Sequence, residues 1–504
     1  MESEFDSMNN YGKFFVDFLT PFFNGLVSIL KSFFGGILEM LNIVKYSEII
    51  KEYKETVSIV FIIIAIICLI LLLGLFSYIV YYLVKKIIKV IRKSHEQDAL
   101  LEEVEKLNYD MIKLKQENDK LTMMAQGGDG EFDENGNPIT KLGKGESRFF
   151  KLTQIDKKWE NAKPEVFRND LNLEQICDNF RNYAASELEL YYTPDLIRLF
   201  ISAFGASRIL ILQGISGTGK TSLAYAFGHF LGNDSVIAPV QPSWRDRTEL
   251  FGYFNEFTKR FNETELLSKM YEATYNDKIY VTILDEMNIA RVEYYFAEML
   301  SIMEMPSKKE WVVNLVSSPW ENDPKKIVNG NFNLPGNMWY IGTINNDDST
   351  FMVTDKVYDR AMPIDINDKC AKFDAPKTGC ASLSDEYFEK LFDEAKNKYP
   401  VSKEMLKKLD ELDQYIIEHF RISFGNRIMR QIEDFVPSYV ACGGKEIDAI
   451  DYLIASKILR KFEQLNLAFI KNELDEFINY LNVNFGKENM NKCKDFIIRL
   501  KKSM

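Results

Sequence analysis

The sequence predicts an α/β domain built on a parallel sheet, followed by a helical region and preceded by a long apolar segment. Three observations predict this class. A glycine-rich turn joins a short apolar run to an amphipathic helical pattern. Two later apolar runs end in acidic or amide residues, as parallel strands do where one sheet edge forms a site. Beyond them, residues 385–504 repeat Leu, Ile and Phe at helical spacing.

The long apolar segment is residues 56–84, which contain no charged side chain. At about 1.5 Å of rise per residue, such a helix exceeds the ~30 Å hydrocarbon core, so we expect one transmembrane helix. By the positive-inside rule, the basic residues at 85–93 place the rest of the chain in the cytoplasm. Lys, Asn, Ile and Phe are abundant, as in proteins of AT-rich bacterial genomes. We therefore expect a single-pass protein of a bacterial cell membrane.

Residues 1–50 are predicted to form an amphipathic, membrane-associated N-terminus. Within residues 11–44, Phe and Leu recur at helical spacing opposite a polar face, which is typical of a helix lying in the membrane interface. A second span is the alternative, although Asp17 and Lys31 would destabilise it in a bilayer.

The next segments are predicted to connect the membrane part to the α/β domain. Residues 94–125 form a short coiled coil, because Leu recurs every seven residues from Leu100 to Leu121 at the d positions and Asn118 occupies one a position of the same seam. A single charged helix is the alternative. Residues 126–147 are rich in Gly, Asn and Asp and read as a flexible linker. Residues 148–192 form a helical lead-in.

The glycine-rich turn carries the strongest chemical signal. Thr193-Pro194 starts a helix, residues 208–213 form an apolar strand, and Gly214 to Thr221 read G-x-x-x-x-G-K-T before the next helix. In such a P-loop, backbone N–H groups surround phosphates, the lysine reaches the outer phosphates and the threonine hydroxyl binds Mg²⁺. The predicted nucleotide-binding residues are Gly214, Ser216, Gly217, Thr218, Gly219, Lys220, Thr221 and Ser222.

Two further strands end in residues that suit phosphate chemistry. Residues 279–284 lead into Asp285 and Glu286, a Walker B arrangement in which the first acid holds Mg²⁺ and the second polarises the attacking water. The alternative is a strand that ends in two solvated acids. Residues 338–343 lead to Asn345, which is placed to orient that water. The metal ligands are therefore predicted to be Thr221 and Asp285.

The P-loop, DEMN, GTINNDD and DKVYDRA together resemble the McrB-type, dynein-related branch of AAA+ proteins, over roughly residues 170–470. The resemblance implies an AAA+ core at 193–365 and an insertion with a helical lid at 366–504. Asn345 matches the sensor-1 asparagine and Asp348 ends the N-x-x-D signature. Arg360 matches the arginine finger that acts on a neighbour's nucleotide, and Arg427 matches sensor 2.

The function that follows is a nucleoside triphosphatase that uses ATP or GTP with Mg²⁺. Most relatives use ATP, which favours an ATPase, although no residue decides the base. The resemblance implies a homo-hexameric ring that remodels or translocates a substrate, as the motor of a McrBC-like bacterial defence system with a separate nuclease or effector subunit. A chaperone-like remodeller of membrane protein complexes is the first alternative. A nucleotide-switched scaffold is the second, and Glu286 and Asn345 argue against it.

Composition excludes several other classes. The net charge of -12 argues against a protein that coats nucleic acid, though it leaves direct nucleic-acid binding through a local basic channel open. Six cysteines without a CxxC pair and three histidines give no zinc or disulfide framework. Trp244, Arg245 and Arg247 lie in the region that the resemblance places at a ring pore, and they suit a substrate grip or a tight turn equally.

Overall fold

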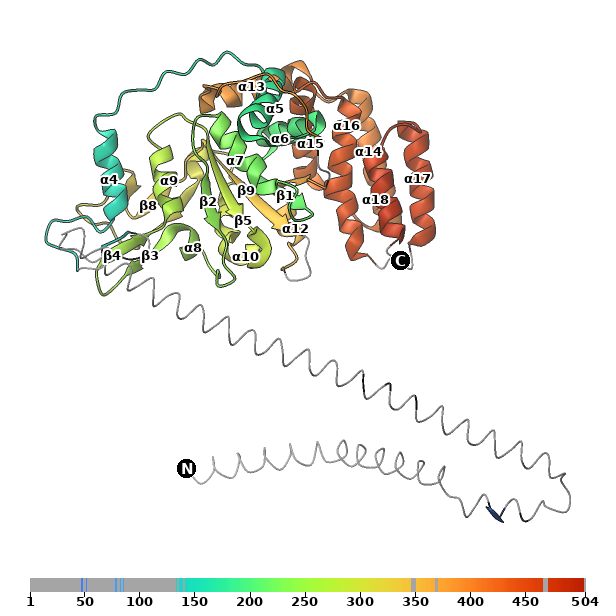
Figure 1. The fold of residues 1–504 in the computed structure, drawn as a ribbon, viewed down its shortest axis with the longest axis horizontal. Helices are drawn as coiled ribbons and strands as arrows, with labels where there is room; N and C mark the ends of the chain where they lie inside the picture. The colour runs from blue at the N-terminus through green and yellow to red at the C-terminus, as the bar shows by residue number, and fades with distance from the viewer. Residues whose placement is uncertain are drawn as a thin grey trace. The chain divides into compact units, whose positions relative to one another are not determined.

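A computed structural model describes most of the C-terminal three quarters of the chain. The chain divides into two units, Met1–Gly128 and Asp129–Met504, and the second contains the fold discussed below (Figure 1). The described residues are 141–345, 350–367, 370–465 and 470–502, with 47, 48, 51, 78, 82, 85, 133 and 136–138. The predicted amphipathic N-terminus, coiled coil and most of the linker lie outside them.

The membrane location expected from the sequence is not supported, and the prediction is corrected here. No described helix combines the length and the apolar character that crossing a bilayer requires. The longest of them, α14 (Lys403–Phe420), has 18 residues and is interrupted by charged side chains throughout. The predicted span at 56–84 contributes only Tyr78 and Tyr82 to the described residues. The single-pass anchor, and the cytoplasmic placement that depended on it, are therefore withdrawn.

The centre of the fold is a five-stranded parallel sheet in the order β10-β1-β9-β5-β2. Its strands are β1 (Ile209–Gly214), β2 (Val236–Pro239), β5 (Tyr280–Asp285), β9 (Met338–Asn345) and β10 (Met362–Asp365). Every residue of β1 is buried, which explains its unbroken apolar run, because a parallel strand is covered on both faces. Because all five strands run the same way, their carboxyl ends meet at one edge, where the glycine-rich loop also begins.

Helices cover both faces of this sheet (Figure 1). Leu210 and Leu212 of β1 face one hydrophobic cluster, and Ile209 and Ile211 face the other, as the two-residue period of a strand requires. The first cluster contains α5 (Leu173–Leu188), α6 (Pro194–Ala206), α7 (Lys220–Phe230) and the C-terminal helices. The second contains α4 (Phe150–Trp159), α8 (Thr248–Phe251), α9 (Glu265–Ala273), α10 (Val292–Tyr295) and α11 (Ala297–Ile302).

A β-hairpin that the sequence did not indicate stands between α8 and α9. Its strands are β3 (Gly252–Asn255) and β4 (Arg260–Glu263). The end of the predicted linker lies along it, since the Leu142 N–H donates to the Thr258 carbonyl at 2.8 Å. The buried Glu263 carboxylate accepts the N–H groups of Lys151 and Leu152 at 2.9 and 2.8 Å and so caps α4. A second small sheet has the order β6-β8-β7, with β6 (Val312–Asn314), β7 (Ile327–Val328) and β8 (Asn331–Asn333).

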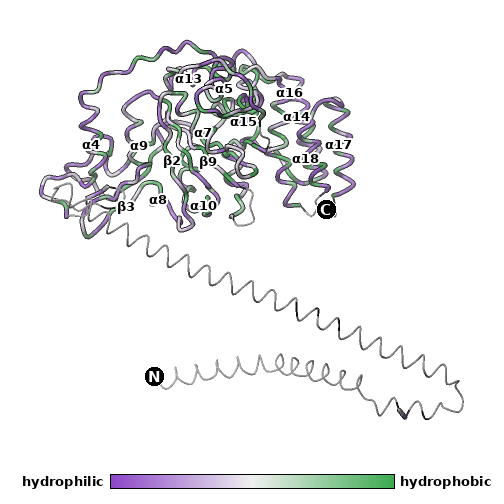
Figure 2. The backbone as a smooth tube through the Cα atoms, viewed as in Figure 1, coloured by the Kyte–Doolittle hydropathy of each residue, from purple (hydrophilic) through white to green (hydrophobic). Residues whose placement is uncertain are grey.

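The described residues between 385 and 502 are mostly helical, as the sequence predicts. Ser384 and Ser402 cap α13 and α14 by accepting backbone N–H groups. Figure 2 shows both hydrophilic and hydrophobic colour along α14, α17 and α18, as amphipathic helices have. The elements are α13 (Asp385–Lys398), α14, α15 (Gly425–Ala441), α16 (Glu446–Leu453), η3 (Ile454–Ile458), η4 (Leu459–Gln464), α17 (Lys471–Phe485) and α18 (Asn491–Lys502).

Candidate functional site

The glycine-rich loop connects β1 to α7 at the carboxyl edge of the sheet. Gly214 has φ 142°, and a Cβ there would lie 2.3 Å from the Ile366 carbonyl oxygen, so the chain passes too closely for any side chain. Gly219 has φ 88° and allows the sharp entry into α7. Thr218 closes the loop by donating from its hydroxyl to the Ile215 carbonyl at 2.9 Å. The backbone therefore bends around a small concavity at the N-terminus of α7.

Lys220 is held inside this loop. Its side chain is buried, and Nζ donates to the carbonyls of Gly214 and Ile215 at 3.0 and 2.8 Å. These two contacts hold the ammonium group inside the loop, next to the N-terminus of α7. A buried cation next to the N–H groups of a helix N-terminus is an arrangement that attracts an anionic ligand.

The ends of β5 and β9 and the first turn of α7 meet through Asp285. Its Oδ1 accepts hydrogen bonds from the Thr221 and Thr343 hydroxyls, each at 2.7 Å. The Thr343 hydroxyl also accepts the Glu286 N–H at 2.9 Å. Glu286 has φ 51° and an exposed side chain, so its carboxylate projects from the sheet edge. The structure thus brings Thr221, Asp285 and Glu286 together, with Thr343 as the link between them, and their roles toward nucleotide stay predictions.

Asn288 holds the backbone beside this group. It is buried, and its Nδ2 donates to the Asn345 carbonyl at 3.1 Å and to the Thr350 hydroxyl at 2.9 Å. These contacts fix the chain on both sides of residues 346–349. Asp348 falls in that stretch, outside the described residues, so its predicted role stays a prediction. Asn345 itself lines the cavity described next.

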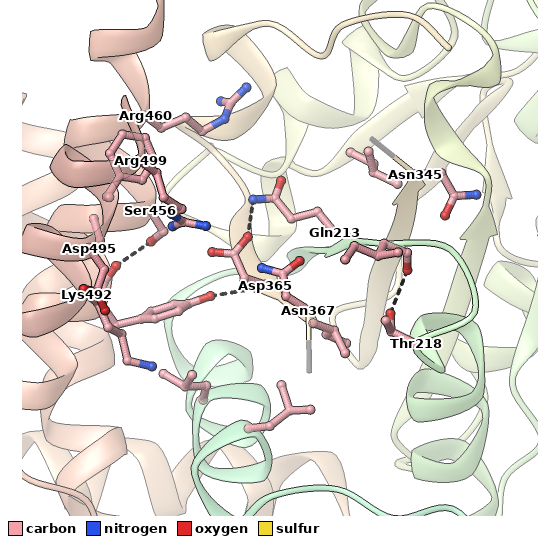
Figure 3. A pocket seen from close by; sticks show the side chains of 18 of the residues that line it. Gln213, Thr218, Asn345, Asp365, Asn367, Ser456, Arg460, Lys492, Asp495 and Arg499 are labelled. Carbon is pink, nitrogen blue, oxygen red and sulfur yellow. Dashed lines mark hydrogen bonds between the residues drawn. The ribbon is translucent and has the colours of Figure 1, made fainter. Parts of the chain in front are cut away.

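A cavity of about 1650 Å³ opens beside the glycine-rich loop (Figure 3). Gly217, Thr218 and Gly219 form part of one wall, and residues 189–193 and the C-terminal helices form others. The Tyr192 hydroxyl donates to the Gly219 carbonyl at 3.3 Å, and burial raises the pKa of Tyr192 well above its usual range. This cavity is large enough for a nucleotide, since small-molecule pockets measure roughly 300–1,000 Å³.

Gln213 organises the floor of the cavity. Its Nε2 donates to Asp365 Oδ1 at 2.7 Å, as Figure 3 shows, and its Oε1 accepts the Tyr358 hydroxyl at 2.6 Å. Burial raises the pKa of Tyr358 to about 12, so the phenol stays protonated and remains a donor at neutral pH. The last residue of β1 before the glycine is thereby tied to β10 and to α12 (Asp355–Tyr358).

The structure places Arg360 and Arg427 together, away from the cavity wall. Both pair with Glu304, whose Oε1 lies 3.2 Å from Arg360 Nε and 2.7 Å from Arg427 Nη2. Neither arginine lines the cavity that contains Thr218 and Asn345. Within one chain, neither side chain therefore lies on the wall of this cavity, and their roles toward nucleotide stay predictions.

The candidate pore residues have structural contacts. Arg247 forms an ion pair with Glu298 at 2.8 Å and donates to the Asn314 carbonyl at 2.6 Å. Trp244 packs edge-on against Tyr295, with ring centroids 5.1 Å apart. These contacts favour the structural interpretation for both residues.

The oxygen atoms around Asp285 suit Mg²⁺. A hydroxyl and a carboxylate are hard ligands of the kind that this ion prefers, and Mg²⁺ commonly takes its remaining ligands from water and substrate phosphates. Over the ranges that the structure describes, no group of three or more His, Cys, Asp or Glu is arranged to hold a metal by itself. The residues present fit a Mg²⁺ ion that arrives with a nucleotide.

Sequence reasoning missed four residues of this site. Thr343 and Asn288 belong to the quoted GTINN and DEMN stretches, and Tyr192 precedes the predicted Thr193-Pro194 helix start, so each had a local signal without an assigned role. Arg499 of α18 also lines the cavity, and no local sequence signal pointed to it.

Comparisons with known proteins agree with this geometry in part. A family described as "Domain of unknown function (DUF8727)" matches residues 381–504. The chain is similar to the type IV methyl-directed restriction enzyme EcoKMcrB subunit of Escherichia coli (strain K12), with 26% identity over 201 residues. The match covers 38% of this chain and 41% of that relative, so the chain spans well under half of the relative's length. A distant McrB-like relationship for part of the chain is what this similarity supports.

Proposed function

We propose that this chain is a Mg²⁺-dependent nucleoside triphosphatase of the McrB-like AAA+ type, using ATP or GTP. The observation that carries the proposal is the Asp285 carboxylate, which accepts the Thr221 and Thr343 hydroxyls while the next residue, Glu286, projects into solvent. If Asp285 and Glu286 were only two solvated acids at the end of a strand, nothing would explain the neighbouring glycine-rich loop and its buried lysine. The similarity to the McrB subunit supports the same choice.

Each residue has a role that follows from its position. Gly214, Ser216, Gly217, Thr218 and Gly219 present backbone N–H groups to the phosphates, with Lys220 adding its charge and Ser222 continuing the first turn of α7. Mg²⁺, when bound through Thr221 and Asp285, neutralises charge that develops on the phosphates. Glu286 accepts a proton of the attacking water, and Asn345 orients that water. Asp348 lies outside the described residues and is included in the catalytic group from the resemblance alone.

The proposal includes a homo-oligomeric ring, a hexamer by resemblance. Within one chain, Arg360 pairs with Glu304 and its side chain retains 24% exposure, so it is available to a neighbouring copy only after leaving Glu304. Arg427 pairs with the same Glu304 carboxylate, so we propose that it is released from Glu304 together with Arg360. The ring remodels or translocates a substrate for a separate nuclease or effector subunit, which is the role suggested by the relative's description as a restriction enzyme subunit.

The experiment is steady-state hydrolysis of ATP and of GTP by the purified full chain. Glu286→Gln removes the proton acceptor and keeps its shape, so we expect turnover to fall by about 10²–10⁴-fold while nucleotide still binds. Glu256→Gln is the matched control, because Glu256 is an exposed acid in the β3–β4 hairpin paired with Lys259. Equal turnover in both variants, or no nucleotide binding by the parent, would contradict the proposal.

A further inference from the structure

A stack of aromatic rings joins α14 to α17. Tyr415 of α14 lies at its centre, with its ring centroid 4.2 Å from that of His419 on the same helix and 4.2 Å from that of Tyr480 on α17. The rings are close to parallel, at interplanar angles of 30° and 25°. Phe477 of α17 is fully buried and lies 5.6 Å from Tyr415, so it anchors the stack in the core.

This stack reaches the surface of the C-terminal helices. His419 is exposed, and Tyr415 and Tyr480 are partly exposed. Val483 follows Tyr480 on the same side of α17 and is 82% exposed. Core packing accounts for the buried Phe477 but gives no reason for a column of rings that remains open to solvent.

Carboxylates surround the exposed rings. Glu473 and Glu476 lie seven and four residues before Tyr480, a spacing that places all three on one face of α17. Burial raises the pKa of Tyr415, and the charges of Glu476 and Glu473 raise it further, as they do only from nearby. Burial also raises the pKa of Tyr480, and the charge of Glu411 on α14 adds to that rise.

The cations of the two helices leave this negative charge largely uncompensated. Lys407 and Lys408 pair with carboxylates of their own helix, at 3.6 and 2.8 Å. Lys471 begins α17 on the side away from Glu473 and Glu476, and these two acids form no ion pair within the residues that the structure describes. The rings and carboxylates together form one surface, the aromatic face: Glu411, Tyr415, His419, Glu473, Glu476 and Tyr480.

The chemistry of the aromatic face favours a guanidinium. An arginine side chain stacks flat on aromatic rings and is weakly hydrated, while its N–H groups donate to carboxylates. A lysine ammonium is attracted by the same carboxylates, but it is compact and strongly hydrated and gains less from a stacked ring. Nucleic acid and other polyanions are repelled by a surface of this charge.

We propose that the aromatic face is a docking surface for an arginine-containing segment of another protein, with a guanidinium stacked on the exposed rings and hydrogen-bonded to Glu473 and Glu476. The residues of this face, all of them described, lie off the wall of the cavity beside the glycine-rich loop, so the inference is independent of the proposed nucleotide site. Figure 1 shows α17 at the outer edge of the C-terminal helices, away from the sheet. The surface lies within residues 381–504, which match the family of unknown function.

The test measures fluorescence anisotropy of a labelled Arg-Gly repeat peptide and of the matching Lys-Gly peptide with the full chain, in about 0.15 M salt to screen general attraction. We expect the arginine peptide to bind about fivefold more tightly than the lysine peptide, because only the guanidinium stacks. Tyr480→Leu should remove this preference, whereas Tyr480→Phe, which keeps the ring, should retain it.

A matched pair of double variants tests the carboxylates. Glu473→Gln with Glu476→Gln should weaken binding of the arginine peptide about fivefold, through the loss of two exposed ion pairs. Glu386→Gln with Glu433→Gln changes the net charge equally at exposed acids of α13 and α15, and it should leave binding unchanged.

Three results would overturn the proposal. Equal binding of the two peptides by the parent, or equal weakening by both double variants, would mean general attraction to an acidic protein. A lower oligomeric state of Tyr480→Leu in sedimentation, with peptide binding unchanged, would make the face an interface between copies of this chain. Thermal unfolding of each variant identifies any loss that comes from misfolding, and the double variant at Glu473 and Glu476 tests the face without altering a ring.

Discussion

Replacing Thr343 by valine tests the central geometry of the site, because valine keeps the shape of threonine and removes only the hydroxyl. Thr343 is 3% exposed, and its Oγ1 donates to Asp285 Oδ1 and accepts the Glu286 N–H. Thr343→Val therefore removes a hydrogen bond to a charged group and leaves the Glu286 amide without its partner. These two losses together should lower the free energy of unfolding by about 2–4 kcal/mol.

The same change should impair hydrolysis. Asp285 keeps the Thr221 hydroxyl, but it loses the contact that fixes it to β9, and Glu286 loses the anchor of its backbone. Removal of a group that orients a metal ligand typically costs about 10–100-fold in metal affinity or activity, and we expect a loss of that size in the Mg²⁺ dependence of turnover. Urea unfolding and a Mg²⁺ titration of ATP or GTP hydrolysis measure the two effects.

Thr282→Val is the control for this prediction. Thr282 lies on β5 and is fully buried, and its hydroxyl has no hydrogen-bond partner in the described part of the chain. Its replacement should leave the free energy of unfolding unchanged or raise it by up to about 1 kcal/mol. The reasoning is refuted if Thr343→Val and Thr282→Val have the same stability and the same Mg²⁺ dependence.

Two further predictions concern the glycine loop and a buried lysine. Gly214→Ala should destabilise the protein by about 2–4 kcal/mol in urea unfolding, because the new Cβ would lie 2.3 Å from the Ile366 carbonyl oxygen. Gly217→Ala places a Cβ that meets no atom within 4 Å, so it should lower the free energy of unfolding only through left-handed backbone strain, by about 1–2 kcal/mol. If both variants lose the same free energy of unfolding, the predicted clash at Gly214 is wrong. Lys457 is buried and donates to the Tyr358 carbonyl at 2.7 Å, and burial lowers its pKa to about 7. The unfolded chain then binds the extra proton between about pH 7 and the ordinary lysine pKa near 10.4, so this group makes stability rise with pH in that window. Lys457→Met should reduce the difference between the free energies of unfolding in urea at pH 7 and at pH 9. If that difference is the same in the parent and the variant, the lowered pKa of Lys457 is not the cause of the pH dependence.

Much of the sheet could be predicted because its strands are short apolar runs with sharp ends. The expected strands at 208–213, 279–284 and 338–343 agree within one or two residues with β1, β5 and β9. Fully buried parallel strands contain few polar residues, so their first and last residues are easy to locate in the sequence. The four-residue β10 and the β3–β4 hairpin were missed, since so short a run carries little periodic signal.

The arrangement of the C-terminal helices could not be predicted in the same way. Helical periodicity identifies which face of α18 is buried, yet it carries no information about what the exposed face meets. Arg499 faces the cavity only because Asp451 and Asp195 fix the helix from two other elements. The ion pairs of Arg360 and Arg427 with Glu304 likewise join residues that are far apart in sequence, and no local sequence pattern predicts them.

The measurement that tests the account most directly is hydrolysis of ATP and GTP by the purified full chain in Mg²⁺ and in EDTA, alongside Asp285→Asn. The account predicts turnover in Mg²⁺ that is lost both in EDTA and in the variant, because the Asp285 carboxylate joins Thr221 to the strand ends that carry Glu286 and Asn345. Turnover that persists in Asp285→Asn, or that is indifferent to Mg²⁺, would contradict it.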